Sequence, residues 1–170
     1  MKPVAVALAA GILLTGSAAA VARAPQSSLC EAGETVRFTC KAGAKVISFC
    51  GDGEALRYRF GKPGAPELSF PENGRPASSV FHYSSAAYSG GGEARVRFLN
   101  GSFEYIVYTA LIAGSWNADG TRDHEELDGV LVRRNGRNVA NVRCTTAPDN
   151  DLYVLGDDLP AEEFNIDLDR

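Results

Sequence analysis

The sequence predicts an all-β protein: a single antiparallel β-sandwich or barrel of about eight or nine short strands, stapled by disulfides, with a short C-terminal helix or tail. Apolar residues repeat with a period of two, which is typical of half-buried strands rather than helices. Turn-forming residues separate these runs at short intervals, as they do in sandwiches and barrels. An even number of cysteines in a chain with an export signal predicts a disulfide framework.

The chain begins with the pattern of a signal peptide. Lys2 supplies a positive start, an apolar run covers residues 4–14, and small residues occupy 15–22. We expect residues 1–20 to form the signal peptide, with residue 24 as the latest boundary. The apolar run is shorter than the roughly 20 residues that cross a bilayer, and no other segment suits a span. We therefore expect a periplasmic or secreted protein with no membrane span after cleavage.

The mature chain of about 150 residues is long enough for one domain with its own core. Residues 25–146 form the expected antiparallel β domain. Residues 147–170 form an acidic C-terminal segment with eight acidic residues and one basic residue, a composition typical of a solvated tail. Acidic and basic residues nearly balance over 25–146, so nothing indicates a nucleic-acid partner.

Short alternating runs define the expected strands. In the first half they are residues 35–40, 45–50, 55–61, 67–70 and 79–83. In the second half they are residues 94–99, 102–109, 130–134 and 137–144. Residues 106–112 and 127–132 flank an acidic loop and also have strand character. A helix is expected only over 160–164, where Pro160 and two glutamates suit a first helical turn.

Two Asn-Gly pairs predict tight hairpins with type I′ turns, in which both loop residues have positive φ. The first loop, Asn100-Gly101, places an aromatic pair and an ion pair across the strands: Phe98 with Phe103 and Arg97 with Glu104. The second loop, Asn135-Gly136, places Val132 opposite Val139 and Arg134 opposite Arg137.

The cysteines allow three disulfide pairings. Cys40 lies near the turn of the first expected hairpin, whereas Cys30 and Cys50 lie near its open end. We therefore expect Cys30–Cys50 to clip the N-terminal segment to this hairpin, and Cys40–Cys144 to tie the hairpin to the last strand. A zinc site is the alternative use of four cysteines, but it favours a C-x-x-C spacing that this chain lacks.

Several segments around the cysteines have a familiar pattern. They are Leu29-Cys30, Phe38-Thr39-Cys40, Lys45–Cys50, Tyr58–Gly61 and Pro66–Leu68, with Arg97-Phe98 and Gly129-Val130 further along. Together they resemble a family of exported proteobacterial proteins that has no assigned activity. The resemblance implies a periplasmic location and no particular mechanism.

Catalytic candidates are few. The histidines are His82 and His124, and several serines lie near His82 in the sequence. A Ser–His–acid set is recognised by its geometry, and the G-x-S-x-G motif of the α/β-hydrolases is absent. All four cysteines are expected in disulfides, so no thiolate nucleophile is expected. We expect a protein that is not an enzyme and has no cofactor; a hydrolase that uses His82 or His124 is an alternative.

Residues 115–126 contain a candidate calcium loop. Asn117, Asp119 and Asp123 fall on oxygen-ligand positions of an EF-hand loop, and Glu126 falls on its last position. Ser115 replaces the usual first Asp, and the flanks have strand character rather than helix character. The same composition is ordinary for a surface turn, which is the alternative interpretation.

Arginines alternate along two of the expected strands: Arg57 and Arg59 on one, Arg95 and Arg97 on the other. If these strands adjoin, the four side chains line one face that suits an anionic glycan or an acidic partner. The alternative is a solvated face whose arginines pair with the chain's own acidic residues.

Ser89 begins the glycine-rich stretch 89–92. A phosphate-binding loop precedes a helix, whereas the residues after this stretch have strand character, so we expect a surface loop. Ser89-Gly90 also matches the start of the Ser-Gly-x-x-Tyr loop that bacterial lysozyme inhibitors insert into the enzyme. Glu93 stands at the position of the tyrosine.

These observations favour an exported, non-enzymatic β-domain that binds a protein or a component of the cell envelope. A lysozyme-inhibitor-like protein is the first alternative, because of Ser89-Gly90. The hydrolase is the second.

Overall fold

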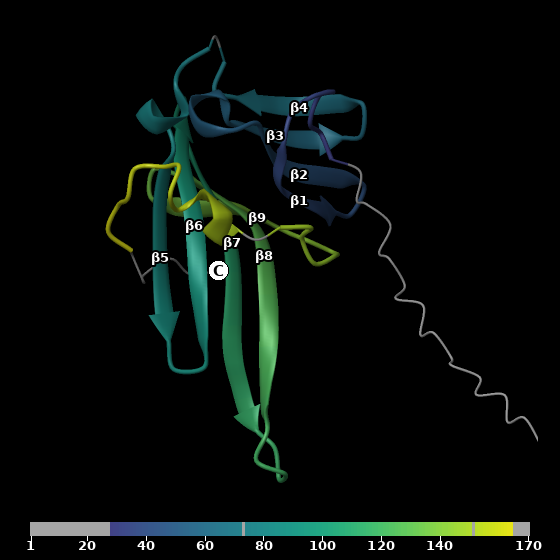
Figure 1. Cartoon of the computed structure of the whole chain (residues 1–170), viewed down its shortest axis with the longest axis vertical. Helices are drawn as coiled ribbons and strands as arrows, with labels where there is room; N and C mark the ends of the chain where they lie inside the picture. The colour runs from purple at the N-terminus through teal and green to yellow at the C-terminus, as the bar shows by residue number, and fades with distance from the viewer. Residues whose placement is uncertain (1–27, 73, 151, 165–170) are drawn as a thin grey trace, which may run out of the picture.

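The computed structural model describes residues 28–72, 74–150 and 152–164. These residues form two antiparallel sheets that pack against each other without closing into a barrel (Figure 1), so the sandwich is the correct one of the two expected architectures. The expected signal peptide, residues 1–20, lies outside the described residues. No helix in the described part is long and apolar enough to cross a membrane.

Each sheet is a meander in which consecutive strands pair. The four-stranded sheet contains β1 (Val36–Ala42), β2 (Lys45–Cys50), β3 (Arg57–Lys62) and β4 (Ala65–Phe70). The five-stranded sheet contains β5 (His82–Tyr88), β6 (Gly91–Asn100), β7 (Phe103–Trp116), β8 (Arg122–Arg134) and β9 (Arg137–Arg143). Short 3-10 turns are η1 (Gly53–Ala55), η2 (Ala77–Ser79) and η3 (Leu152–Leu155).

Aromatic side chains fill the space between the sheets. The Phe98 ring on β6 lies 5.0 Å from the Tyr58 ring on β3 and stacks on the Tyr105 ring at 4.9 Å. Phe81, which precedes β5, meets Phe49 edge to face. Burial raises the pKa of the Tyr58 phenol well above its ordinary value, with a smaller contribution from Tyr105. These rings supply much of the apolar burial that stabilises the sandwich.

The two sheets differ in length, and this difference leaves part of the larger sheet uncovered. Strands β7 and β8 contain 14 and 13 residues, whereas the strands of the four-stranded sheet contain six or seven. The four-stranded sheet lies over one end of the five-stranded sheet, and the β7–β8 hairpin continues well beyond it (Figure 1).

Both disulfides have the pairing that the hairpin argument predicts. Cys30 is bonded to Cys50, which holds the N-terminal segment on β2. Cys40 is bonded to Cys144, which ties β1 to the segment after β9. That segment then follows β1, because the amide of Thr145 donates to the carbonyl of Lys41.

The predicted register of the first Asn-Gly hairpin is wrong by two residues. Asn100 pairs with Phe103, so the loop is Gly101-Ser102, with positive φ at Gly101 and not at Ser102. Glycine at the first loop position is typical of a type II′ turn rather than type I′. A shift of two residues leaves every side chain on its predicted face. Phe98 therefore still points into the core, where it faces Tyr105 instead of Phe103.

The second hairpin has the predicted turn but not the predicted register throughout. Asn135 and Gly136 both have positive φ, and Arg134 pairs with Arg137. A β-bulge between Val132 and Arg133 then shifts the pairing, so Val132 lies opposite Ala140 rather than Val139. A bulge adds one unpaired residue to one strand, and no local sequence pattern in this hairpin marks it.

The expected helix over 160–164 does not form. Residue Ala161 instead makes a parallel bridge with Tyr83 on β5. The amide of Tyr83 donates to the carbonyl of Pro160, and the amide of Glu162 donates to the carbonyl of Tyr83. Pairing with a sheet edge therefore outweighs the local helix preference of this short segment. We name residues 160–164 the strap.

The described part of the acidic segment is packed rather than solvated. Leu152 and Leu155 of η3 are fully buried in the main core, and Leu159 is nearly so. The apolar residues between the acidic ones dock this segment on the sandwich, which composition alone does not reveal.

Candidate functional site

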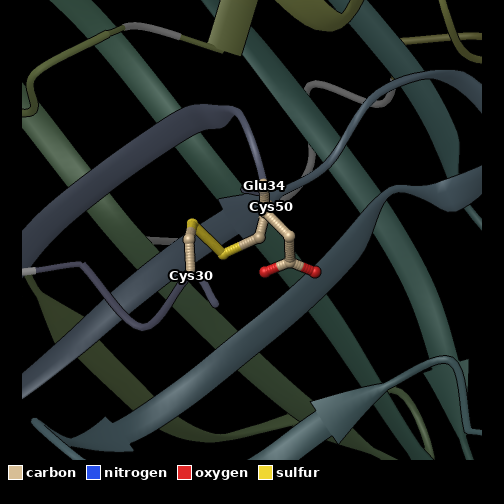
Figure 2. A group of neighbouring side chains, drawn as sticks. All are labelled: Cys30, Glu34 and Cys50. Atoms are coloured by element: carbon tan, nitrogen blue, oxygen red, sulfur yellow. A yellow bond between two sulfur atoms is a disulfide. The ribbon is translucent and has the colours of Figure 1, made fainter. Parts of the chain in front are cut away.

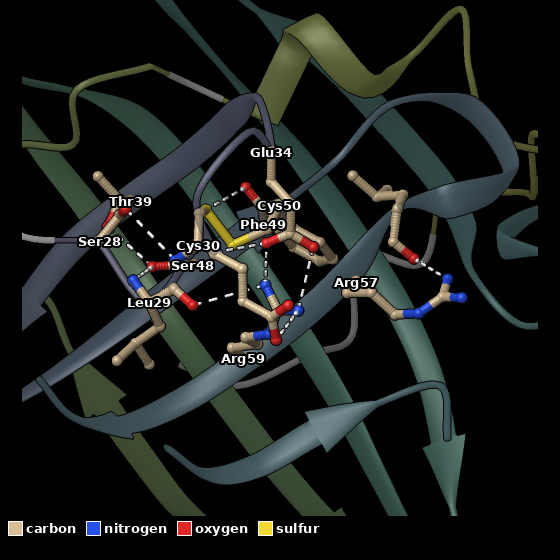
Figure 3. A network of polar contacts seen from close by, with 12 residues as sticks. Ser28, Leu29, Cys30, Glu34, Thr39, Ser48, Phe49, Cys50, Arg57 and Arg59 are labelled. Carbon is tan, nitrogen blue, oxygen red and sulfur yellow. Dashed lines mark hydrogen bonds and ion pairs between the residues drawn. A yellow bond between two sulfur atoms is a disulfide. The ribbon is translucent and has the colours of Figure 1, made fainter. Parts of the chain in front are cut away.

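A buried arginine joins the N-terminal segment to the four-stranded sheet (Figure 3). Arg59 on β3 donates to both carboxylate oxygens of Glu34, and at 3.2 Å to Glu31. Its side chain is 8 % exposed, and that of Glu34 is 24 % exposed. The hydrogen bond and the charge of Arg59 lower the pKa of Glu34, and Glu34 in turn raises the pKa of Arg59. This pair stabilises the fold around the first disulfide.

The Cys30–Cys50 disulfide lies beside Glu34, and their potential ligand atoms are within 4.8 Å of one another (Figure 2). A metal binds a cysteine as its thiolate. Because the two sulfur atoms are bonded to each other, neither offers a thiolate. The arrangement is a structural staple next to an ion pair.

The four arginines that the sequence suggested as one face are divided between the two sheets. Arg57 and Arg59 lie on β3, whereas Arg95 and Arg97 lie on β6, and these strands do not adjoin. Arg57 donates to the carbonyl of Leu56. The single arginine-lined face therefore does not form, because strands with similar alternation belong to different layers.

The arginines of β6 form ion pairs with acidic residues of the same chain. Arg95 is buried and donates to Glu93 at 2.6 Å, while the Phe164 ring of the strap covers its guanidinium at 4.1 Å. Arg97 forms a two-oxygen contact with Glu162, which raises the pKa of Arg97. A cavity of about 230 Å³ lies here, between the strap and the outer face of the five-stranded sheet. Two ion pairs line it, Arg97–Glu162 and Arg133–Glu104, and paired charges of this kind are typical of a structural cluster.

The two histidines lie on different strands. His82 on β5 faces Arg97 and lines a small cavity with Ser79, whereas His124 on β8 is exposed and lies opposite Ala113. Within the described residues, neither histidine is hydrogen-bonded to a serine or a carboxylate. In this part of the chain, no serine and carboxylate are therefore arranged around His82 or His124 as a hydrolase would need.

The candidate calcium ligands are also separated. Asn117, Asp119 and Asp123 lie at the tip of the β7–β8 hairpin, where the Asn117 amide nitrogen donates to Asp123 at 2.9 Å. Glu126 lies further along β8, opposite Leu111. Within the described part of the chain, no close group of potential metal ligands includes these residues. The polar residues at the tip form a hairpin turn instead. In this turn Thr121 donates to Asp119 and lowers the pKa of that carboxyl.

Ser89 lies at the turn between β5 and β6 rather than in a long surface loop. The loop is Ser89-Gly90, since Tyr88 pairs with Gly91 and the other glycines belong to β6. Gly91 allows β6 to approach β7 closely, because an added Cβ would lie 2.1 Å from the Leu111 carbonyl oxygen. The glycine-rich stretch is thus a tight turn and the start of a strand.

Two hairpin ends meet at the far end of the five-stranded sheet. Arg122 on β8 donates to the carbonyls of Gly114 and Ser89, so it bridges the β7–β8 hairpin and the β5–β6 turn. Its guanidinium also lies 5.3 Å from the centre of the Trp116 ring. Trp116 is 70 % exposed, which is unusual for the largest apolar side chain.

Trp116 belongs to a sheet face that continues from the core into solvent. Core residue Val107 is followed on the same side of β7 by Leu111 and Ala113, and their β8 partners are Glu126 and His124. We name this surface the open face; its residues are Leu111, Ala113, Trp116, Arg122, His124 and Glu126. The four-stranded sheet is too short to reach it (Figure 1).

Sequence patterns did not identify the open face. Trp116 lies within the candidate calcium loop, residues 115–126. The signal that the sequence offers for a binding role is that Trp116 is the single tryptophan of the chain. Whether such a residue is buried or exposed depends on the length of the opposing sheet.

No protein-family model, curated protein sequence or solved structure matches this chain.

Proposed function

We propose that the protein is an exported, non-enzymatic binding module that contacts a partner protein through the open face. The observation that carries this proposal is Trp116, exposed at the end of a hairpin that projects beyond the rest of the sandwich. Tryptophan and arginine are the residues most enriched among those that dominate binding energy at protein interfaces. Trp116 and Arg122 lie together at this tip.

Rigidity supports the same role. Arg122 holds the Trp116 ring and both hairpin ends through two backbone carbonyls, so the tip loses little conformational freedom when a partner binds. Two-stranded ribbons of this length need support, and the β5–β6 turn provides it.

Export is supported by two independent features. The N-terminal sequence has the pattern of a signal peptide. The described domain contains two disulfides, which persist in oxidising compartments such as the bacterial periplasm or the extracellular medium. Both features support a periplasmic or secreted location.

The test is site-specific photo-crosslinking in the cells that express the protein. A photoreactive phenylalanine analogue replaces Trp116, and in a control it replaces Leu99, which is 58 % exposed at the opposite end of β6. We expect one discrete crosslinked protein from position 116 and none from position 99. Equal or absent crosslinking at both positions overturns the proposal.

A lysozyme inhibitor is the second candidate function, because Ser89-Gly90 lies at a hairpin end beside Arg122, which also lies over the Trp116 ring. Glu93, at the position of the expected tyrosine, is fully buried and hydrogen-bonded to Tyr88 and Arg95. The Ser-Gly-x-x-Tyr mode is therefore incomplete. Lysis of bacterial cells by lysozyme, measured with a large molar excess of the purified protein, tests this role; undiminished lysis rejects it.

A further inference from the structure

A groove of about 540 Å³ opens at the base of the open face, where the segment after β9 crosses the five-stranded sheet. The hairpin side of the groove contains Leu111, Glu126 and Asp128. The crossing segment contributes Asp149, Tyr153 and Val154. The groove shares Leu111 and Glu126 with the open face, so the two surfaces are continuous.

The walls of the groove combine exposed apolar area with negative charge. Leu111, Tyr153 and Val154 are 39 %, 46 % and 44 % exposed, which is high for large apolar side chains. The acidic side chains at the groove are Glu126, Asp128 and Asp149, and none of its described lining residues is basic. Thr109 donates to Asp128 at 2.6 Å and so orients that carboxylate.

This combination matches one kind of side chain. An arginine has an apolar stem that packs on aliphatic and aromatic surfaces, and a planar cation that binds carboxylates with two hydrogen bonds. The guanidinium group also stacks on aromatic rings, which a lysine ammonium does less well. The nearby Arg37 of β1 is already engaged, because it donates to the Val154 carbonyl and to Asp158.

We propose that the groove receives an arginine side chain of the partner protein, flanked by apolar residues that contact Leu111 and Tyr153. The inference rests on the proposed function and adds the chemistry of the partner to it. Trp116 anchors one end of the contact, and the acidic groove selects a basic, partly apolar segment at the other end.

The experiment titrates the mature protein, labelled with nitrogen-15, with the peptide acetyl-Leu-Arg-Leu-amide and follows backbone amides by NMR. The same peptide with citrulline in place of arginine removes the charge and keeps the shape. We expect the arginine peptide to shift amides of residues 109–111, 126–128, 149–150 and 153–154, and the citrulline peptide to bind at least about fivefold more weakly.

A matched pair of variants tests the groove itself. Glu126→Gln removes a groove carboxylate, whereas Glu125→Gln removes one from the adjacent residue, which points to the other face of β8. We expect Glu126→Gln to weaken binding of the arginine peptide by about threefold, and Glu125→Gln to leave it unchanged.

Equal binding of the two peptides, shifts confined to other parts of the protein, or equal effects of the two variants would overturn the arginine proposal. If position 116 still crosslinks to a single protein in that case, the binding module stands and only the groove assignment fails. If the arginine peptide binds as expected while crosslinking at 116 is absent, the groove stands and the open-face proposal fails.

Discussion

At the scale of single residues, the ion pair between Arg59 and Glu34 shows how burial changes the value of a charge. The Lys45–Glu67 pair is also well formed, at 2.7 Å, but its side chains are 38 % and 45 % exposed. Solvent screens such a surface pair, so it contributes little to stability. Arg59 is almost completely removed from water, so its partners must replace the lost hydration.

Glu34→Gln is expected to lower the free energy of unfolding by about 1–2 kcal/mol at pH 7, because it leaves a buried guanidinium without its main charged partner. Urea unfolding of the oxidised protein measures the change. Glu67→Gln, the surface control, should change stability by less than about 0.5 kcal/mol. Similar losses in both variants would contradict the assignment of Arg59–Glu34 as the more important pair.

The same pair predicts a pH dependence. The folded-state pKa of Glu34 lies below its unfolded value of 4.5, so its stabilising contribution is complete above that value. It is lost as the pH falls through the folded-state pKa. The stability difference between the natural protein and Glu34→Gln should therefore be constant above about pH 5.5 and shrink steadily below pH 4.5. A difference that grows on acidification would refute the argument.

At the scale of elements, close backbone approach explains why glycine begins β6. The amide and carbonyl groups of β6 and β7 pair along nine positions from Gly92–Leu111 to Asn100–Phe103. A methyl group at position 91 would collide with the β7 backbone at the end of this ladder, where no flexible side chain can move aside.

Gly91→Ala is therefore expected to destabilise the protein by about 1–3 kcal/mol, the usual cost of inserting an atom into a packed site. Gly114→Ala is the matched control, since its Cβ would lie 3.3 Å from the nearest atom, the Asp123 carbonyl oxygen. We expect its cost to stay below about 1 kcal/mol. Thermal unfolding followed by circular dichroism distinguishes the two; equal midpoints would show that β6 and β7 separate easily.

The strap is a second element whose position depends on a distant contact. Two backbone hydrogen bonds with Tyr83 and the Arg97–Glu162 ion pair hold it on the edge of β5. Few bonds hold a segment of this kind, so its opening should be local.

Glu162→Gln should speed hydrogen exchange at the amides of Tyr83 and Glu162 by roughly fivefold, because the half-buried ion pair contributes about 1 kcal/mol to strap closure. Exchange in the central strands should not change. Glu163→Gln alters the neighbouring residue, which forms no ion pair in the described part of the chain. An equal effect of this control would show that the ion pair does not hold the strap.

At the scale of the whole molecule, the disulfides restrict the unfolded chain to different extents. Cys40–Cys144 has a sequence separation of 104, and Cys30–Cys50 has a separation of 20. In the chain-entropy model, the longer loop contributes about 4.7 kcal/mol and the shorter about 3 kcal/mol.

Replacing both members of each pair by serine tests this order. The Cys40→Ser, Cys144→Ser variant should lose more stability than the Cys30→Ser, Cys50→Ser variant, by about 1–2 kcal/mol. Guanidinium unfolding under non-reducing conditions measures both. The reverse order would mean that breaking Cys30–Cys50 also removes contacts of the N-terminal segment with Arg59. The free energy of those contacts would then exceed the difference in chain entropy between the two loops.

Local sequence patterns predict some features of this fold and not others. Alternation along β3 and β6, the Asn135-Gly136 turn and the cysteine positions rest on local geometry or on chain order, so strands, faces and disulfide pairs could be predicted. The loop at Gly101-Ser102 and the bulge near Val132 could not, because competing turns differ by little free energy and packing of Phe98 and its neighbours selects between them.

The sequence alone determined the all-β class, the alternating strands and the disulfide pairs, because each follows from periodicity and spacing along the chain. Only the tertiary structure decided which strands share a sheet, that residues 160–164 pair with β5, and that Trp116 and the acidic groove lie open. The first two depend on which distant segments pair, and the third depends on how far one sheet extends past the other. All three are relations between distant residues, which no local pattern contains.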